Sequence, residues 1–352
     1  MKIGILPFRK EKNIDGLNRV TQSLVKEILK IDHKNDYSFI GSGRFLGIDI
    51  PEKKIIPDSW NVMNLNSCVM NEQYDIVHSN YYSFYINKKI PCAKILTIHD
   101  LNPEMLKLYG ENQKKSVPMM DQIIADSNNT KKDIVDIFNV NPDKVKVIYP
   151  GMFKLNMEYD EKNISDRIKK LTNQPYIMTV STLREYKNMI GLVRAFILFK
   201  ELHKDSNLNL ILVGKDFKNN SVRMQIGELC SGRNDVVFTG YVSDEELVYL
   251  YKNCLATGFV SFFEGFGLPV LESLYYGKTV ICSNATSLPE VGGDAVEYCD
   301  PYDVESIEYA FERVVLDDNN RHKLEKLATI QASKFSYEKM AKETLDVYKQ
   351  FE

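Results

Sequence analysis

The sequence predicts an α/β protein with two domains, each built on a parallel sheet. Its 352 residues exceed the roughly 100–200 residues of a typical domain. Short apolar runs alternate with amphipathic stretches along most of the chain, which is typical of strands separated by helices. The alternation breaks once, where Tyr149-Pro150-Gly151 is followed by the polar stretch 158–173. We expect the domain boundary at this break.

The candidate strands are short runs dominated by aliphatic and aromatic residues. They cover residues 2–6, 37–41, 75–79, 93–99, 122–126 and 145–148 in the first domain, and 176–181, 208–214, 236–239, 256–261, 279–283 and 295–299 in the second. Helical periodicity lies between them, for example over 188–203 and 244–252. Because open α/β sheets bind ligands at the carboxyl ends of their strands, we expect a site in a cleft shared by the domains.

Composition and charge exclude several classes of protein. The 45 basic and 48 acidic side chains give a formal net charge of −3, which argues against a nucleic-acid binder held by a general basic field. No apolar run approaches the ~20 residues that span a bilayer, and the N-terminus has no signal-peptide pattern, so we expect a cytoplasmic protein. The six cysteines form no CxxC pair and the five histidines no HxxxH or HExxH pattern, so we expect reduced cysteines and no bound zinc.

The segment 261–272, SFFEGFGLPVLE, is the most informative part of the chain. It follows an apolar strand and opens a helix, with Pro269 suited to the first helical turn. Its two glycines permit a tight turn that brings the backbone close to a ligand. The N–H groups around Gly267 and Leu268 then form an anion site, assisted by the helix dipole. We expect a diphosphate to occupy it.

Two carboxylates, Glu264 and Glu272, bracket this loop. A glycosidase pair is one alternative, but retaining hydrolases place their carboxyls about 5–5.5 Å apart. Eight residues of helix rise about 12 Å, so a directly cooperating pair is disfavoured. We expect Glu272 to accept hydrogen bonds from a ribose and Glu264 to reach the sugar. A helix-capping role for Glu264 and a solvated Glu272 are the remaining alternatives.

The spacing of Glu264 and Glu272 around a GFGLP core resembles the EX7E motif of retaining glycosyltransferases of family four. Further segments are similar to that family, namely residues 284–295, 237–242, 180–188, 97–101 and 147–151. The resemblance implies the GT-B fold, in which two Rossmann-like domains face each other across a central cleft. It divides the chain into an acceptor domain, 1–155, a nucleotide-sugar donor domain, 156–335, and a C-terminal helix, 336–352, that crosses back to the first domain.

The activity implied by the resemblance is metal-independent, retaining transfer of a hexose from a nucleoside-diphosphate sugar. No cofactor is expected, and the acceptor is a glycan or a lipid-linked molecule in surface polysaccharide synthesis. The segments 181–183 and 261–272 are similar to those of mannosyltransferases of O-antigen and capsule synthesis, which favours GDP-mannose. UDP-glucose, UDP-galactose and UDP-GlcNAc fit the same motifs.

The resemblance also assigns roles to individual residues. Lys187 and Arg184 neutralise the departing diphosphate, although relatives often carry the arginine where this chain has Tyr186, and a surface charge is the alternative for Arg184. Together with Glu264 and His99, which lies close to donor sugar and acceptor, they form the expected catalytic set. The expected donor-binding residues are Gly16, Thr182, Tyr241, Val242, Gly265, Phe266, Gly267, Leu268 and Glu272.

The acceptor side is expected to include Asp100 and His78, with first-domain architecture as the alternative for His78. Only Gly16 remains of a loop that is rich in glycine in many relatives, and no GxGxxG follows the first strand, which disfavours a Rossmann oxidoreductase. Two other functions stay open: a non-catalytic sugar-nucleotide-binding subunit and a nucleotide-sugar epimerase. The lysine pairs at 53–54, 88–89 and 114–115 raise the hypothesis of peripheral contact with a membrane.

Overall fold

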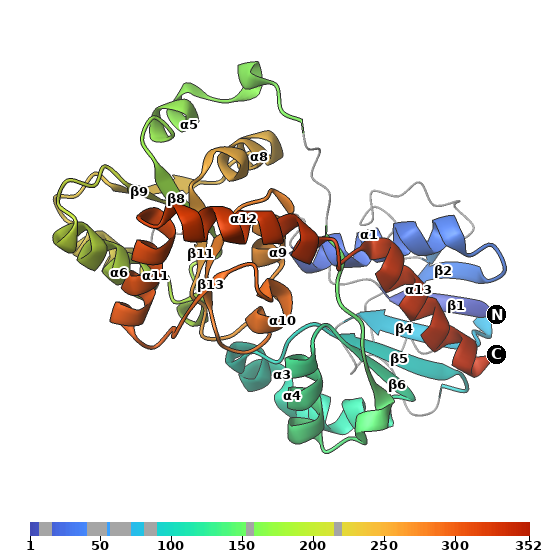
Figure 1. Cartoon of the computed structure of the whole chain (residues 1–352). Helices are drawn as coiled ribbons and strands as arrows, with labels where there is room; N and C mark the ends of the chain where they lie inside the picture. Colours follow the sequence, from blue (N-terminus) through green and yellow to red (C-terminus); the bar gives the residue numbers. More distant parts are fainter. Residues whose placement is uncertain (7–15, 41–54, 57–71, 81–89, 153–157, 215–219) are drawn as a thin grey trace. The chain divides into compact units, whose positions relative to one another are not determined.

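The computed structural model describes residues 1–6, 16–40, 55–56, 72–80, 90–152, 158–214 and 220–352. The chain divides into two compact units, which are considered separately (Figure 1). Unit 1 comprises Met1–Phe153 and Phe335–Glu352, and unit 2 comprises Lys154–Lys334. The boundaries expected from the sequence lie at 155 and 335. The lysine pairs 53–54 and 88–89 fall outside the described residues.

Unit 1 is built on a seven-stranded parallel sheet with the order β3-β2-β1-β4-β5-β6-β7. Its strands are β1 (Lys2–Leu6), β2 (Asp36–Ile40), β3 (Ile55–Ile56), β4 (Ile76–Asn80), β5 (Ala93–Ile98), β6 (Gln122–Ala125) and β7 (Val145–Val147). The sequence missed β3, because two residues give no periodicity to detect. The strand order reverses between β1 and β4, as in doubly wound folds.

The helices of unit 1 include the C-terminal segment of the chain. They are α1 (Gly16–Ile31), α3 (Pro103–Ser116), α4 (Asn128–Phe138), α13 (Tyr337–Tyr348) and the short 3-10 turns η4 (Val117–Met119), η5 (Pro142–Lys144) and η8 (Lys349–Phe351). Ser336 caps the start of helix α13, where its hydroxyl accepts from the N–H of Lys339. Helix α13 packs against α1 (Figure 1). The start of α13 also lies close to Gly151, where a Cβ would lie 2.1 Å from the backbone nitrogen of Tyr337.

Unit 2 carries a six-stranded parallel sheet with the order β10-β9-β8-β11-β12-β13. Its strands are β8 (Tyr176–Val180), β9 (Asn209–Val213), β10 (Val236–Gly240), β11 (Ala256–Phe259), β12 (Val280–Ser283) and β13 (Glu297–Cys299). The order reverses between β8 and β11, so this point is where a doubly wound sheet binds ligands.

The helices of unit 2 are α5 (Asp166–Leu171), α6 (Met189–Leu202), α7 (Ser221–Leu229), α8 (Asp244–Asn253), α9 (Leu268–Tyr275), α10 (Leu288–Gly292), α11 (Val304–Val315) and α12 (Asp318–Ala332), with 3-10 turns η6 (Glu161–Asn163) and η7 (Glu185–Lys187). Helices α6 to α10 connect successive strands, whereas α5 precedes β8, and α11 and α12 follow β13. The polar stretch 158–173, read from the sequence as a boundary, contains η6 and α5. Its apolar residues explain this, because Ile164 and Ile168 are buried in the same core as Tyr176, and Tyr159 and Leu171 pack against that core.

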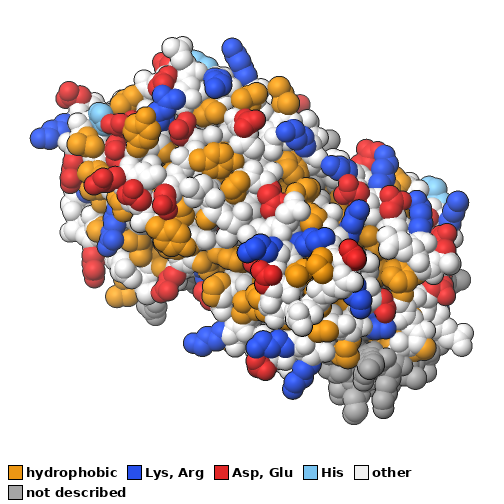
Figure 2. Space-filling model, turned by 60° about the horizontal axis from the view of Figure 1, so that its bottom comes forward, with side chains coloured by type: hydrophobic (Ala, Val, Ile, Leu, Met, Phe, Trp, Pro, Cys, Tyr) orange, Lys and Arg blue, Asp and Glu red, His pale blue; other side chains and the backbone are white. Residues whose placement is uncertain are grey.

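Charges of both signs are interspersed over the face of the molecule in Figure 2, with apolar side chains scattered between them. This mixture agrees with the small net charge and gives that face no broad basic field. Within the described parts of the chain, no helix combines the length and hydropathy needed to cross a bilayer.

Candidate functional site

An ion pair joins the two loops that follow β8 and β11, the strands on either side of the reversal in unit 2. The Nζ of Lys187 lies 2.8 and 2.7 Å from the two carboxylate oxygens of Glu264. The hydroxyl of Ser261 donates to the same carboxylate at 2.8 Å. The side chains of Lys187 and Glu264 retain 19% and 13% of their exposure. The pair is therefore shielded enough to be strong, while solvent still reaches it.

The loop carrying Lys187 is fixed by the residue that follows it. Asn188 adopts a left-handed conformation (φ 53°), and its side-chain oxygen caps α6 by accepting from the N–H of Gly191. The Asn188 amide also donates to the carbonyls of Val260 and Pro301, at 3.0 and 2.7 Å. These bonds tie the start of α6 to the end of β11 and thereby set the position of Lys187.

Glu264 is held through its backbone. Its N–H donates to Thr286 Oγ1 at 3.1 Å. The hydroxyl of Ser287 donates to the carbonyls of Glu264 and Phe266, at 2.9 and 3.0 Å. The segment after β12 therefore fixes the backbone of the loop after β11 by hydrogen bonds.

The start of α9 depends on Gly267. This glycine caps the helix with φ 112°, a conformation that side chains rarely adopt, and a Cβ there would lie 2.6 Å from Leu288 Cδ2. Gly265 and Phe266, which precede it, are buried. Leu268 opens α9, and a proline occupies the first turn. The backbone geometry thus presents the start of a regular helix directly after the ion pair.

Glu272 lies one turn into α9 and has a tyrosine partner. The hydroxyl of the fully buried Tyr251, on α8, donates to Glu272 Oε2 at 2.8 Å. Burial, and then the carboxylate itself, raises the pKa of Tyr251, so its phenol stays protonated and remains a donor. Stacking on Tyr276, with ring centroids 5.1 Å apart, fixes the phenol further. Glu272 is therefore not a freely solvated carboxylate.

The other expected residues of unit 2 lie in two turns. Thr182 and Arg184 are exposed in the loop after β8, where the N–H of Arg184 donates to the carbonyl of Thr182 at 2.9 Å. Tyr241 and Val242 follow β10, with Tyr241 81% exposed and Val242 buried. The Tyr241 ring is thus directed to solvent, whereas Val242 belongs to the core of unit 2.

In unit 1, His99 directly follows β5 and is buried against an acidic partner. Its Nδ1 lies 2.7 Å from Asp126 Oδ2, and both side chains are almost completely buried. Burial raises the pKa of Asp126, while the neighbouring His99 acts in the opposite direction. Asp126 therefore fixes the orientation of the His99 ring. Nearby, Asp100 accepts from the side chain of Asn102 at 2.8 Å.

His78, on β4, is fully buried and bonded at both ring nitrogens. Nδ1 lies 2.6 Å from the hydroxyl of Tyr348 on α13, and Nε2 lies 2.8 Å from Thr97 Oγ1 on β5. This position matches the architectural alternative for His78 and leaves no ring nitrogen for an acceptor. Gly16 is the first residue of α1.

Sequence reasoning missed Ser261, Asp126, Tyr251, Thr286 and Ser287. A signal was present for Asp126, because the predicted strands 93–99 and 122–126 end on His99 and Asp126. The observed register pairs Ile98 with Ala125, which makes the two following residues neighbours. Tyr251 gave no such signal, since its contact with Glu272 arises only from the packing of α8 and α9.

Comparison with known proteins defines the class. Over 99% of this chain and 98% of the other, the fold resembles a crystal structure of a glycosyltransferase from Rickettsia africae, with a TM-score of 0.75 and 20% identity. It also resembles Anabaena HepE in complex with UDP and glucose, with a TM-score of 0.76 and 17% identity over 99% of this chain and all of the other. The molecule has the GT-B fold of glycosyltransferases.

The family follows from the sequence. Residues 160–331 match the family model for glycosyl transferases group 1, and residues 14–152 match that for glycosyltransferase family 4. The chain is 26% identical over 343 residues to O-antigen chain mannosyltransferase B of Escherichia coli, covering 93% of this chain and 88% of the relative. The protein belongs to the group 1 and family 4 glycosyltransferases, which confirms the family expected from the motifs.

Proposed function

We propose that this glycosyltransferase transfers a hexose, with retention of anomeric configuration, from a nucleoside-diphosphate sugar to a glycan or lipid-linked acceptor. The observation that carries the proposal is the Lys187–Glu264 ion pair, which follows the two strands at the reversal of the donor-type sheet. A cation at this point suits an anionic ligand, and a helix start directly follows it.

In the proposed complex, the Lys187 ammonium binds the diphosphate as well as Glu264. The lysine stabilises the charge that develops on the departing group, together with Arg184 and the N–H groups at Gly267 and Leu268. This arrangement supplies the positive charge that a metal supplies elsewhere, so the proposed donor chemistry uses no metal at this point. Glu264 is released to accept from a sugar hydroxyl.

The transfer step is proposed to occur on one face of the sugar. The bond between the anomeric carbon and the diphosphate oxygen breaks, and a bond from the same carbon to the acceptor oxygen forms on the same face. The proton of the acceptor hydroxyl moves to the departing phosphate oxygen, so no side chain has to act as the base. The protein's contribution is positioning and charge stabilisation.

The remaining donor contacts are proposed for three further parts of unit 2. The hydroxyl of Tyr251 donates a 2.8 Å hydrogen bond to one oxygen of Glu272 and so orients the carboxylate. In this orientation the carboxylate is proposed to accept hydrogen bonds from ribose hydroxyls. The turn at Tyr241 and Val242 is proposed to read the base through its backbone. Thr182, Gly265 and Phe266 complete the loops around the diphosphate.

GDP-mannose is the proposed donor. The similarity to an O-antigen mannosyltransferase over most of the chain supports mannose, and surface polysaccharide synthesis is the corresponding process. UDP-glucose is the alternative to test beside it, since a structural neighbour binds UDP and glucose. In unit 1, His99, oriented by Asp126, and Asp100 are the proposed acceptor-side groups. The proposed location is the cytoplasm, with peripheral membrane contact.

The proposal is tested by incubating the protein with GDP-mannose or UDP-glucose and a panel of lipid-linked acceptors, with products identified by mass spectrometry. We expect a glycosylated acceptor, and we expect Glu264→Ala to abolish its formation while Glu305→Gln, an exposed glutamate on α11, retains it. A changed donor without an acceptor would identify an epimerase. Donor binding without any product would identify a non-catalytic binding subunit.

A further inference from the structure

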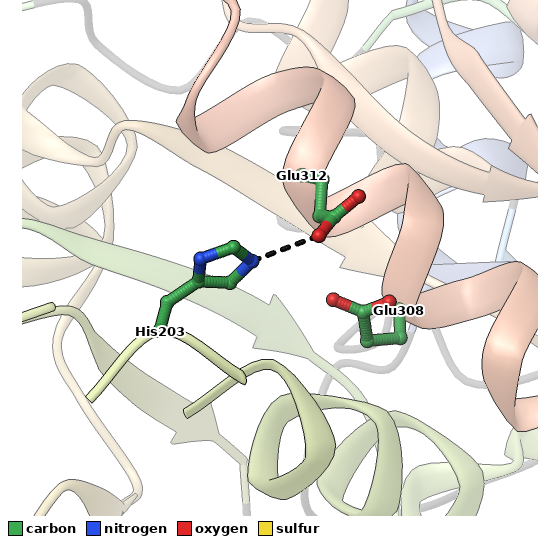
Figure 3. A group of neighbouring side chains, drawn as sticks. All are labelled: His203, Glu308 and Glu312. Atoms are coloured by element: carbon green, nitrogen blue, oxygen red, sulfur yellow. Dashed lines mark hydrogen bonds and ion pairs between the residues drawn. The ribbon is translucent and has the colours of Figure 1, made fainter. Parts of the chain in front are cut away.

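A second cluster of ionisable side chains lies in unit 2, on helices that the proposed donor chemistry does not use. His203 follows the last residue of α6, and Glu308 and Glu312 lie one turn apart on α11. One potential ligand atom from each lies within 4.8 Å of the other two. Figure 3 shows the imidazole and both carboxylates directed toward a common point. We propose that these three residues bind one divalent transition-metal ion, with Zn²⁺ as the best-fitting ion.

The two helices hold this cluster rigidly. Helices α6 and α11 share one hydrophobic core, in which Phe199 lies against Phe311 with ring centroids 5.9 Å apart. The backbone N–H of His203 still donates to the carbonyl of Phe199 at 2.9 Å, so the last turn of α6 fixes the histidine. Glu308 and Glu312 are four residues apart and therefore project from the same face of α11. The donors are thus presented by a preformed scaffold.

The environment of the Glu308 carboxylate indicates a bound cation. Its side chain is buried to 6% exposure, yet its Oε1 has no hydrogen-bond partner among the residues that the structure describes. A buried carboxylate oxygen without a partner is destabilising, and a leucine at this position would avoid the cost. A cation between Glu308, Glu312 and His203 supplies the missing partner.

The chemistry of the three ligand atoms determines which ion fits the cluster. One imidazole nitrogen and two carboxylates suit zinc and similar transition metals, whereas Mg²⁺ and Ca²⁺ prefer oxygen ligands alone. His203 Nε2 now lies 2.8 Å from Glu312 Oε1, and an ion would replace the proton between these atoms. His203 and Glu312 are 29% and 32% exposed, so an ion can enter from solvent and retain a water ligand.

This inference revises the expectation of no bound zinc. That expectation rested on local patterns such as HxxxH, but His203 and Glu312 are 109 positions apart in the sequence. Only the spacing of Glu308 and Glu312 was visible locally, and two glutamates at this spacing are common on helices. The cluster arises from the packing of α6 on α11.

The test is titration of the metal-free full-length protein with Zn²⁺ by calorimetry, with Mg²⁺ and Ca²⁺ as comparisons. We expect one Zn²⁺ per chain, and we expect His203→Gln and Glu308→Gln each to weaken binding by more than about 10-fold, since even outer-shell changes cost roughly 10- to 100-fold. His322→Gln and Glu305→Gln, exposed residues on α12 and α11, should bind Zn²⁺ like the wild type. Absence of wild-type binding, or equal binding by all variants, would overturn the proposal.

A stability measurement separates a metal site from a merely structural carboxylate. Without metal, Glu308→Gln should be at least as stable as the wild type, because it removes a buried charge. With Zn²⁺, only the wild type and the two control variants should gain thermal stability. X-ray absorption should show nitrogen and oxygen ligands at about 2.0–2.2 Å. A sulfur ligand at about 2.3 Å would instead assign the ion to a cysteine and overturn the proposal.

Discussion

The two parallel sheets use polar groups in opposite ways near their carboxyl ends. In unit 2, the residues following β8 and β11 place Lys187 and Glu264 where 19% and 13% of their side-chain surfaces remain exposed. In unit 1, His78 on β4 is completely buried and His99 after β5 is 3% exposed. Both sets are hydrogen bonded, but only the side chains of the first set keep part of their surface exposed to solvent. Similar topology thus places a partly exposed ion pair after the strands of one sheet and buried histidines in the other.

Burial explains the difference in chemistry. Desolvation, assisted by the neighbouring His99, lowers the pKa of His78 to about 3, so this ring is neutral and serves as a fixed link between β4, β5 and α13. A partly exposed ion pair keeps its charges and can exchange one partner for a ligand at moderate cost. Substitutions in unit 2 should therefore change binding and rate, whereas substitutions at His78 should change stability.

The largest effect is expected from Lys187→Ala. Loss of the cation removes stabilisation of the departing diphosphate, and we expect kcat to fall by about 10²–10³-fold. Steady-state kinetics with the active donor measure this, with Lys323→Ala on the exposed face of α12 as the control. A variant that keeps more than about a third of the wild-type kcat would contradict the assigned role.

A smaller effect is expected when the pH is lowered, namely a loss of stability of unit 1. The unfolded chain binds a proton at His78 below about pH 6.5, whereas the folded ring stays neutral to about pH 3. The unfolded state therefore binds more protons in this window, and stability must fall as the pH drops. Between pH 7 and 5 this one group should lower the free energy of unfolding by about 2 kcal/mol.

This pH effect is measured by hydrogen exchange of peptides from β4 and β5 at the two pH values. His78→Gln should be less stable at pH 7, because it loses its bonds to Tyr348 and Thr97, but it should lack most of the pH-dependent loss. His322→Gln, an exposed histidine, should keep the wild-type slope. Equal slopes for wild type and His78→Gln would show that the buried ring does not titrate as described.

The smallest effect is expected from Tyr251→Phe. The substitution removes one hydrogen bond to Glu272 without altering the packing of the ring. A bond of this kind contributes about 0.5–1.5 kcal/mol, so the KM for the donor should rise about 2- to 10-fold with kcat nearly unchanged. A fall in kcat at constant KM would mean that Glu272 acts at the reacting centre rather than at the ribose.

The sequence predicted the strands well because parallel strands are apolar on both faces. Strand β1 was predicted to the residue, and most others to within one or two positions at each end. The helix α5 was missed because its only apolar residues, Ile168 and Leu171, lie within a mostly polar stretch. Local composition records whether a segment is buried, but two apolar residues are too few to show it.

The candidate site was predictable where its parts lie in one motif and not where they meet through packing. The loop 261–272 carries Glu264, Gly267 and Glu272 together, and Lys187 was found through its own loop. The Lys187–Glu264 bond itself spans 77 positions, and no pattern in either loop indicates it. The link between His78 and Tyr348 spans 270 positions and depends on α13 returning to unit 1.

We propose that Lys187, paired with Glu264 beside the start of α9, binds the diphosphate of the donor. Calorimetric titration of wild type and Lys187→Ala with GDP, UDP and the corresponding monophosphates measures this binding. We expect Lys187→Ala to weaken diphosphate binding by about 10- to 100-fold, the value of one charge-assisted hydrogen bond, and to leave monophosphate binding nearly unchanged. Equal diphosphate affinity in the two proteins would contradict the proposal.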